Sequence, residues 1–118
     1  MDDTTAVLKA VADQTRLKIV NMLLRRNYCV RALARHLGLT ESAVSQHLKV
    51  LRGAGLIVGE KRGYFMHYDV DRRQLRALAA RFEELAEIQR EVCQPDAGEC
   101  PQKENVKFQV HDAEDHSQ

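Results

Sequence analysis

The sequence contains no tryptophan, few other aromatic residues and no long apolar run. Aromatic residues make up 5% and hydrophobic residues 44% of the 118 residues, which predicts one small domain with an aliphatic core. Such a core favours helices over a β-sandwich. No apolar run approaches the roughly 18–20 residues of a membrane-spanning helix, and the acidic start MDDTT is unlike a signal peptide. We therefore expect a cytoplasmic protein with no membrane partner.

Cysteine is also scarce. Cys29, Cys93 and Cys100 are the only three, and an odd number in a cytoplasmic chain argues against a framework of disulfides. The sequence also lacks a nucleophile–base motif, a glycine-rich phosphate loop and paired carboxylates suited to a cleft. These absences predict that the protein is not an enzyme and has no obligatory cofactor.

The net charge of +1 hides an uneven distribution. Residues 93–118 hold two basic and six acidic residues, a net charge of −4, whereas residues 1–92 hold 16 basic and 11 acidic residues, a net charge of +5. We expect a folded domain at 1–92 and a flexible acidic tail at 93–118, in which Pro95, Gly98 and Pro101 interrupt any helix. The positive charge of the folded domain is consistent with binding to a polyanionic partner.

Apolar periodicity and capping residues predict the elements of the body. The second helix should bury Leu17, Ile19, Val20, Leu23 and Leu24. Five helices are expected. The first covers residues 4–12, the second follows the N-cap Asp13 and ends at Asn27, the third covers residues 30–38, the fourth follows the N-cap Thr40, and a long fifth follows the N-cap Asp71. Two strands are expected at residues 56–61 and 64–70, joined by a turn at Arg62–Gly63. This mainly α order, α-α-α-α-β-β-α with a β-hairpin wing, is that of a winged helix-turn-helix.

The fourth helix has two distinct faces. Val44, Leu48 and Leu51 should point into the core, and polar residues occupy the opposite face. A polar face is often only solvated, but together with the tight turn, the basic hairpin and the charge split it predicts reading of double-stranded DNA. The expected contacts to bases or phosphates are Thr40, Ser42, Ser45, Gln46, Lys49, Arg52, Lys61 and Arg62. An alternative is a winged helix that contacts other proteins instead of DNA. A salt-dependent shift of duplex DNA in a binding assay would exclude this alternative.

The last helix carries a narrow apolar seam with alternating steps of three and four residues. Such a seam on a terminal helix, after a complete small core, predicts a homodimer. The expected interface residues are Leu75, Leu78, Phe82, Leu85 and Val92.

Three segments resemble the ArsR/SmtB family of bacterial winged-helix repressors: VADQTRLKIVNMLL, VRALARHLGLTESAVSQHLKVLRGAGLI and GEKRGYFMHYDV. The resemblance covers roughly residues 4–92, and the pattern from Ser45 to Leu56 is its most specific part. It implies a homodimer joined through the first and last helices. It also implies an operator-bound form that is released when an effector, often a metal or metalloid ion, binds.

The sensor sites of this family vary in position and in ligand type. Cys29 matches the first cysteine of a Cys-x-Cys site at the start of the third helix, but Arg31 replaces the second. The last helix contains no histidine, which excludes the family's zinc or nickel site there. A third variant uses cysteines near the C-terminus, and Cys93 and Cys100 fit that role.

Cys29, Cys93 and Cys100 would suit a thiophilic effector: arsenite (As(III)), antimonite (Sb(III)), cadmium (Cd(II)) or lead (Pb(II)). Two alternatives stay open. Cys29 is also compatible with a small buried core residue. Cys93 and Cys100 could instead form a reversible disulfide that senses an oxidant or reactive sulfur.

Overall fold

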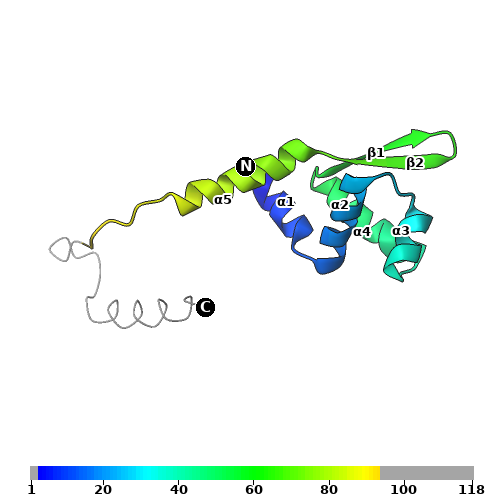
Figure 1. The fold of residues 1–118 in the computed structure, drawn as a ribbon, viewed down its shortest axis with the longest axis horizontal. Helices are drawn as coiled ribbons and strands as arrows, with labels where there is room; N and C mark the ends of the chain where they lie inside the picture. The colour runs from blue at the N-terminus through cyan, green and yellow to red at the C-terminus, as the bar shows by residue number, and fades with distance from the viewer. Residues whose placement is uncertain (1–2, 94–118) are drawn as a thin grey trace. The chain divides into compact units, whose positions relative to one another are not determined.

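The computed structural model describes residues 3–93 and forms five helices and one antiparallel hairpin (Figure 1). The elements are α1 Asp3–Val11, α2 Gln14–Arg25, α3 Val30–Leu37, α4 Glu41–Gly53, β1 Ile57–Arg62, β2 Phe65–Val70 and α5 Arg72–Ala86. This order confirms the predicted winged helix-turn-helix. The chain divides into two compact units, Met1–Glu87 and Ile88–Gln118. None of the helices formed by the described residues is long and apolar enough to cross a membrane.

The helix ends are set by local capping, largely as predicted. Asp13 Oδ2 accepts a hydrogen bond of 2.9 Å from the Arg16 backbone N–H, and Thr40 Oγ1 accepts one of 3.0 Å from the Ala43 N–H. Gly38 adopts a φ of 69° after α3, the left-handed conformation that glycine tolerates best. These caps leave only a short turn between α3 and α4.

Capping also changes the acidity of two carboxyl groups. The backbone hydrogen bond from Arg16 lowers the pKa of Asp13, and the side-chain hydrogen bond from Arg73 lowers the pKa of Asp71. A carboxyl with a lowered folded-state pKa stabilises the fold above its unfolded-state pKa. That stabilisation is lost as the pH falls through the folded-state value.

The core is aliphatic and lies between the helices and the base of the hairpin. Val44, Leu48 and Leu51 are at most 2% exposed, which confirms the predicted inner face of α4. The buried residues are Val7, Ala10, Ile19, Val20, Leu23, Leu33, Ala34, Val44, Leu48, Leu51, Leu56, Ile57 and Tyr68. In α2 one prediction is wrong, because Leu17 is 53% exposed and lines an open hollow of about 490 Å³ between α2 and the end of α3.

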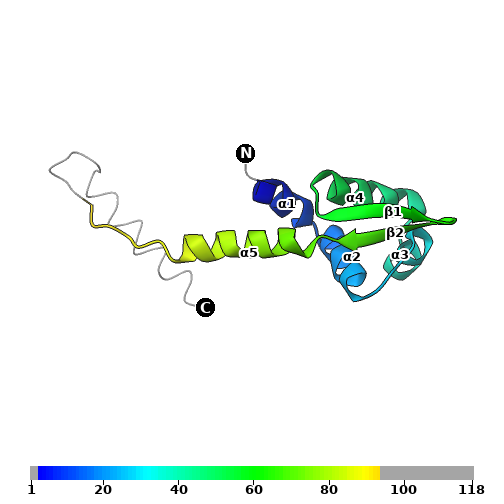
Figure 2. The same ribbon diagram turned by 90° about the horizontal axis from the view of Figure 1, so that it is seen from above.

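The hairpin differs from its prediction by one residue at the turn. Arg62 pairs with Phe65 across the two strands, so the turn residues are Gly63 and Tyr64 rather than Arg62 and Gly63. Gly63 has a φ of 63°, and glycine with positive φ at the first turn position is the pattern of a type II′ turn. In Figure 2 the hairpin runs beside α4, and β1 contacts that helix. The shift places Tyr64 at the tip of the wing.

Gly59→Ala is expected to lower the free energy of unfolding by about 1–3 kcal/mol through overpacking. An added Cβ would lie 2.9 Å from Met66 Cε and 3.1 Å from Tyr68 Cε1. The Met66 side chain can move, but the Tyr68 ring is buried in the core. Gly53→Ala is the matched control, since no heavy atom lies within 4 Å of its added Cβ. Urea unfolding followed by circular dichroism measures both; equal midpoints for Gly59→Ala and wild type would contradict this packing.

The last helix is shorter than predicted. It ends at Ala86, so Val92 does not continue a helical seam; it is 83% exposed and belongs to the second unit. Glu83, Glu84 and Glu87 lie at the C-terminal end of α5, where negative charge opposes the helix dipole and the last turn holds no basic residue. One turn earlier, Arg81 Nη1 lies 4.0 Å from Glu84 Oε1, in an exposed pair that offsets little of this charge. Leu75 and Leu78 pack against the core of their own chain. Phe82 and Leu85 remain about half exposed, at 48% and 54%.

Candidate nucleic-acid interface

The outer face of α4 is polar and open to solvent. Burial of Val44, Leu48 and Leu51 fixes the rotation of the helix, so the side chains on its other side point outward. The exposed residues on this side are Ser42, Ser45, Gln46, Lys49 and Arg52. Among the described residues none of these five side chains is engaged in a hydrogen bond or ion pair. Their donors and acceptors are therefore available to an external partner.

The start of α4 carries a capping hydrogen bond and an ion pair to α3. Thr40 caps the helix with its hydroxyl, and Arg31 Nε lies 3.6 Å from Glu41 Oε2, which joins the first turns of α3 and α4. Both side chains of this pair are more than half exposed, so the ion pair adds little stability. Thr40 is exposed beside the polar face although its hydroxyl already accepts the capping bond.

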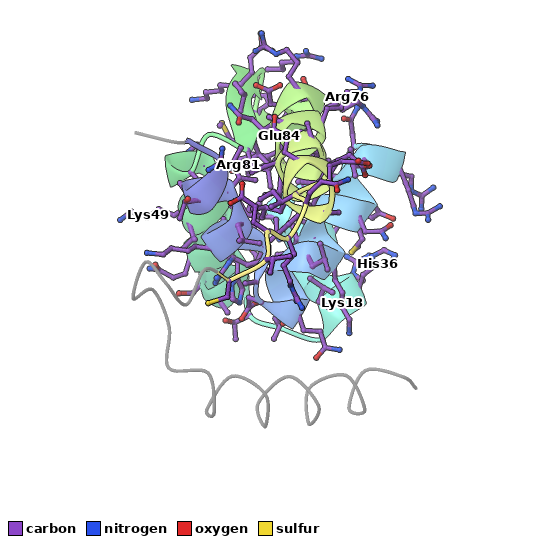
Figure 3. The ribbon with its side chains drawn as sticks, turned by 90° about the vertical axis from the view of Figure 1, so that its left-hand side faces the viewer. Lys18, His36, Lys49, Arg76, Arg81 and Glu84 are labelled. Carbon is purple, nitrogen blue, oxygen red and sulfur yellow. The ribbon has the colours of Figure 1, made fainter. Side chains whose placement is uncertain are left out.

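The wing adds positive charge beside α4. Lys61 and Arg62 end β1 and are both exposed. The Arg62 guanidinium donates a hydrogen bond of 3.1 Å to Glu60 Oε1 in an exposed pair, which a competing phosphate can replace. Figure 3 shows Lys49 on one side of the molecule and Lys18 and His36 on the opposite side. All eight residues predicted to contact DNA thus lie on α4, its cap or the wing, and all are exposed.

The loop before α3 carries a small basic and aromatic cluster that the sequence analysis did not single out. The Arg26 guanidinium lies 5.4 Å from the centre of the Tyr28 ring, and the Tyr28 and His36 rings meet edge to face at 5.4 Å. Arg72 donates a hydrogen bond of 3.2 Å to the carbonyl of Leu24 near the end of α2. These contacts fix the end of α2 against the start of α5 and position α3. The Arg72–Leu24 hydrogen bond joins residues 48 positions apart, so no local pattern indicated it.

The predicted cysteine ligands occupy different parts of the chain. Cys29 is a free, partly buried thiol and the N-cap residue of α3, where its side chain makes no capping hydrogen bond. Cys93 belongs to the second unit and is disulfide-bonded, and Cys100 lies outside the described residues. Within residues 3–93 no group of three or more His, Cys, Asp or Glu side chains could hold a metal ion.

Sequence reasoning also missed the tip of the wing. Tyr64 is 98% exposed and Phe65 is 63% exposed. The signal was present in Gly63, because a type II′ turn takes glycine at its first position and leaves Tyr64 as the second.

Comparison with known proteins agrees with this geometry. Residues 13–58 match the family described as bacterial regulatory protein, arsR family. The arsenical resistance operon repressor of Bacillus subtilis is 37% identical over 87 residues, which cover 66% of this chain and 83% of that protein.

Solved structures resemble the chain over most of their length. Reduced HlyU from Vibrio cholerae has a TM-score of 0.58 and 32% identity, covering 73% of this chain and 90% of HlyU. A homodimeric winged helix-turn-helix DNA-binding domain from Mycobacterium bovis has a TM-score of 0.57, covers 77% of this chain and 89% of that one, and at 24% identity shows the fold alone. The chain belongs to the ArsR family of bacterial regulatory proteins, which are DNA-binding transcriptional regulators and not enzymes.

Proposed function

We propose that the chain is a dimeric transcriptional repressor that binds operator DNA through α4 and the wing and is released by a thiophilic effector. The observation that carries the DNA-binding role is the exposed, unpaired polar face of α4 beside the basic end of β1. The similarity to a protein named as an arsenical resistance operon repressor supports both repression and a thiophilic effector.

Each residue of the interface has a role that follows from its chemistry. Gln46 pairs through its amide with adenine in the major groove, and Ser42 and Ser45 donate to or accept from base edges. Thr40 lies at the helix start, nearest the duplex. The remaining cations hold the protein on the phosphates or read guanine; they are Lys49, Arg52, Lys61 and Arg62.

Gln46→Ala is expected to lose about 1–3 kcal/mol of discrimination between the operator and a variant in which the contacted adenine is replaced. Arg62→Ala, the matched control, should weaken binding to both duplexes alike and reduce the slope of log K against log salt by about one. Fluorescence anisotropy with DNA from upstream of the chain's own gene measures both effects. Half-sites should be centred about 34–36 Å apart, one helical turn. If Gln46→Ala leaves sequence preference unchanged, Gln46 does not read a base.

The dimer rests on the outer end of α5. Phe82 and Leu85 are about half exposed in the single chain and lie on the predicted seam. A monomer would leave this apolar surface in water, and burial against a second copy removes it. The related Mycobacterium bovis domain is described as homodimeric. Leu75 and Leu78 contribute at the inner end of the same seam, where they also support the core.

For the effector we assign the thiolates of Cys93 and Cys100, joined by Cys29 of the partner protomer. Arsenite, antimonite, cadmium and lead all prefer sulfur ligands. Cys29 is a free thiol at the start of α3, so an ion that links it to the second unit would act directly on the helix preceding α4. Because thiols must lose protons to bind, affinity for the ion should rise with pH through the thiol range.

One observation favours a second candidate, a thiol-based redox switch. Cys93 is disulfide-bonded, whereas Cys29 is a free thiol. A related structure, HlyU, is described as the reduced form. In this candidate an oxidant or reactive sulfur species forms the disulfide and releases the operator, and Cys29 takes no part.

A further inference from the structure

Among the described residues, the two aromatic residues at the tip of the wing are not packed into the core. The chain has only three tyrosines and three phenylalanines. Tyr68 is buried in the core, but Tyr64 is 98% exposed and Phe65 is 63% exposed. Neither belongs to the core cluster or to the residues packed against it. Adjacent exposed aromatic side chains at the end of a hairpin are typical of a binding contact rather than of packing.

The surroundings of this tip favour an anionic partner. Tyr64 and Phe65 line a hollow of about 400 Å³ together with Arg31 and the first residues of α3. Lys61 and Arg62 precede them on β1. Glu41 and Glu60 pair with Arg31 and Arg62, so Lys61 leaves the tip with a net positive charge. A purely apolar protein surface would gain nothing from these cations, whereas a nucleic acid offers phosphates to them and apolar base and sugar surfaces to the rings.

The position of Tyr64 and Phe65 beside α4 favours DNA over other polyanions as their partner. The hairpin follows α4 directly and runs beside it, so the aromatic pair continues the interface proposed for the major groove (Figure 2). A two-residue turn is narrow enough to approach a minor groove about 6 Å wide. Apolar side chains that enter this groove act as wedges between base steps and partly unstack them.

We propose that Tyr64, supported by Phe65, is a minor-groove wedge that makes operator affinity depend on the deformability of a base step flanking each half-site. This inference rests on the proposed DNA-binding function. Pyrimidine–purine steps such as TA unstack readily, whereas A-tracts are stiff. The wing would thus read DNA shape at a position where α4 makes no base contact.

The test uses the full-length chain and operators that differ only outside the half-sites. A TA step is moved one base pair at a time through the flank, and a stiff A-tract replaces it in the reference duplex. Wild type should bind one position of the TA step at least about fivefold more tightly than the reference, within the cost range of a base-step deformation. Tyr64→Ala should abolish that difference while leaving affinity for the A-tract duplex within about twofold. Tyr64→Leu should restore part of it, because an aliphatic side chain can still act as a wedge.

Two controls separate a wedge from other losses. Val58→Ala removes an apolar side chain of the same hairpin that is 58% exposed but lies away from the tip, and it should bind like wild type. Lys61→Ala should weaken all duplexes alike and lower the salt slope by about one, whereas Tyr64→Ala should leave that slope unchanged. 2-Aminopurine placed at the favoured step should brighten with wild type, reporting unstacking, and stay dim with Tyr64→Ala.

The outcomes distinguish the wedge from the underlying function. If wild type fails to bind any duplex, the proposed function is wrong and the wedge with it. If wild type binds with sequence preference but Tyr64→Ala keeps the flank dependence and the 2-aminopurine signal, only the wedge is overturned, and the tip is then left as a contact for a protein. An equal loss of affinity on every duplex for Tyr64→Ala would also overturn it.

Discussion

Replacing both Phe82 and Leu85 with lysine is expected to produce folded monomers whose operator affinity is at least about 100-fold lower, because one half-site no longer assists binding at the other. The two side chains are about half exposed and do not belong to the core of their own chain, so the monomer should keep its fold. Lysine at both positions would place two like charges of each protomer in an apolar interface. Sedimentation velocity gives the mass, and anisotropy on the two-site operator gives the affinity.

The choice of positions follows from the structure. Leu78 lies on the same seam but packs against the core, so Leu78→Lys would confuse loss of dimer with loss of fold. Ala77→Lys with Ala80→Lys is the matched control, since both residues are exposed on the opposite side of α5 and the added charge is the same. A wild-type chain that sediments as a monomer at micromolar concentration would contradict the interface. So would a Phe82→Lys, Leu85→Lys chain that remains a dimer.

Features that depend on short-range rules were predictable from the sequence. Asp13, Thr40 and Asp71 cap the helices because their side-chain oxygens reach backbone N–H groups two or three residues ahead, an arrangement that needs no distant partner. The inner face of α4 follows from apolar residues at helical spacing. Once that face is fixed, the opposite face is fixed too, so the exposure of Gln46 and Lys49 could be anticipated.

The differences arose where tertiary contacts decide. The alternation of side chains predicts a hairpin but does not fix the register of its two strands to within one residue. In the observed register Met66 and Tyr68 pack over Gly59, and the turn residues are Gly63 and Tyr64. Leu17 fits the helical period of α2, yet within residues 3–93 it is left 53% exposed beside an open hollow. The apolar spacing of the α5 seam continues beyond Ala86, although the helix ends there. Apolar spacing alone takes no account of the unfavourable interaction between acidic residues and the C-terminal end of a helix.

A sensor site is harder to predict for the same reason. A recognition face lies on a single helix, so its residues follow from helical spacing. The proposed thiolate site would instead draw its cysteines from distant parts of the sequence and from two protomers. Cys29 could be placed at the start of α3 from the sequence, but its chemical partners could not. Cysteine substitutions therefore test the proposed effector site more directly than sequence patterns do.

Replacing both Cys93 and Cys100 with serine is expected to abolish release of the operator by arsenite while leaving affinity in the absence of effector within about twofold. Serine keeps the size of the side chain but provides no soft ligand. If the ion favours the DNA-free conformation, its coupling to DNA in wild type should be about 1–3 kcal/mol, a 5- to 150-fold change in affinity. The measurement is operator anisotropy after reduction with a phosphine, because Cys93 must be released from its disulfide before it can bind an ion.

Cys29→Ser separates the two candidate effectors, since Cys29 is already a free thiol and belongs only to the three-thiolate site. If arsenite binds three sulfurs, Cys29→Ser should lose release by arsenite as completely as the double substitution does. If a disulfide is the switch, Cys29→Ser should still be released by an oxidant or a persulfide donor, and arsenite should have little effect on wild type. Cadmium and lead extend the comparison to divalent ions, and zinc serves as the less thiophilic reference. A Cys93→Ser, Cys100→Ser chain that is released normally by arsenite, cadmium, lead and persulfide would show that these cysteines are not the sensor.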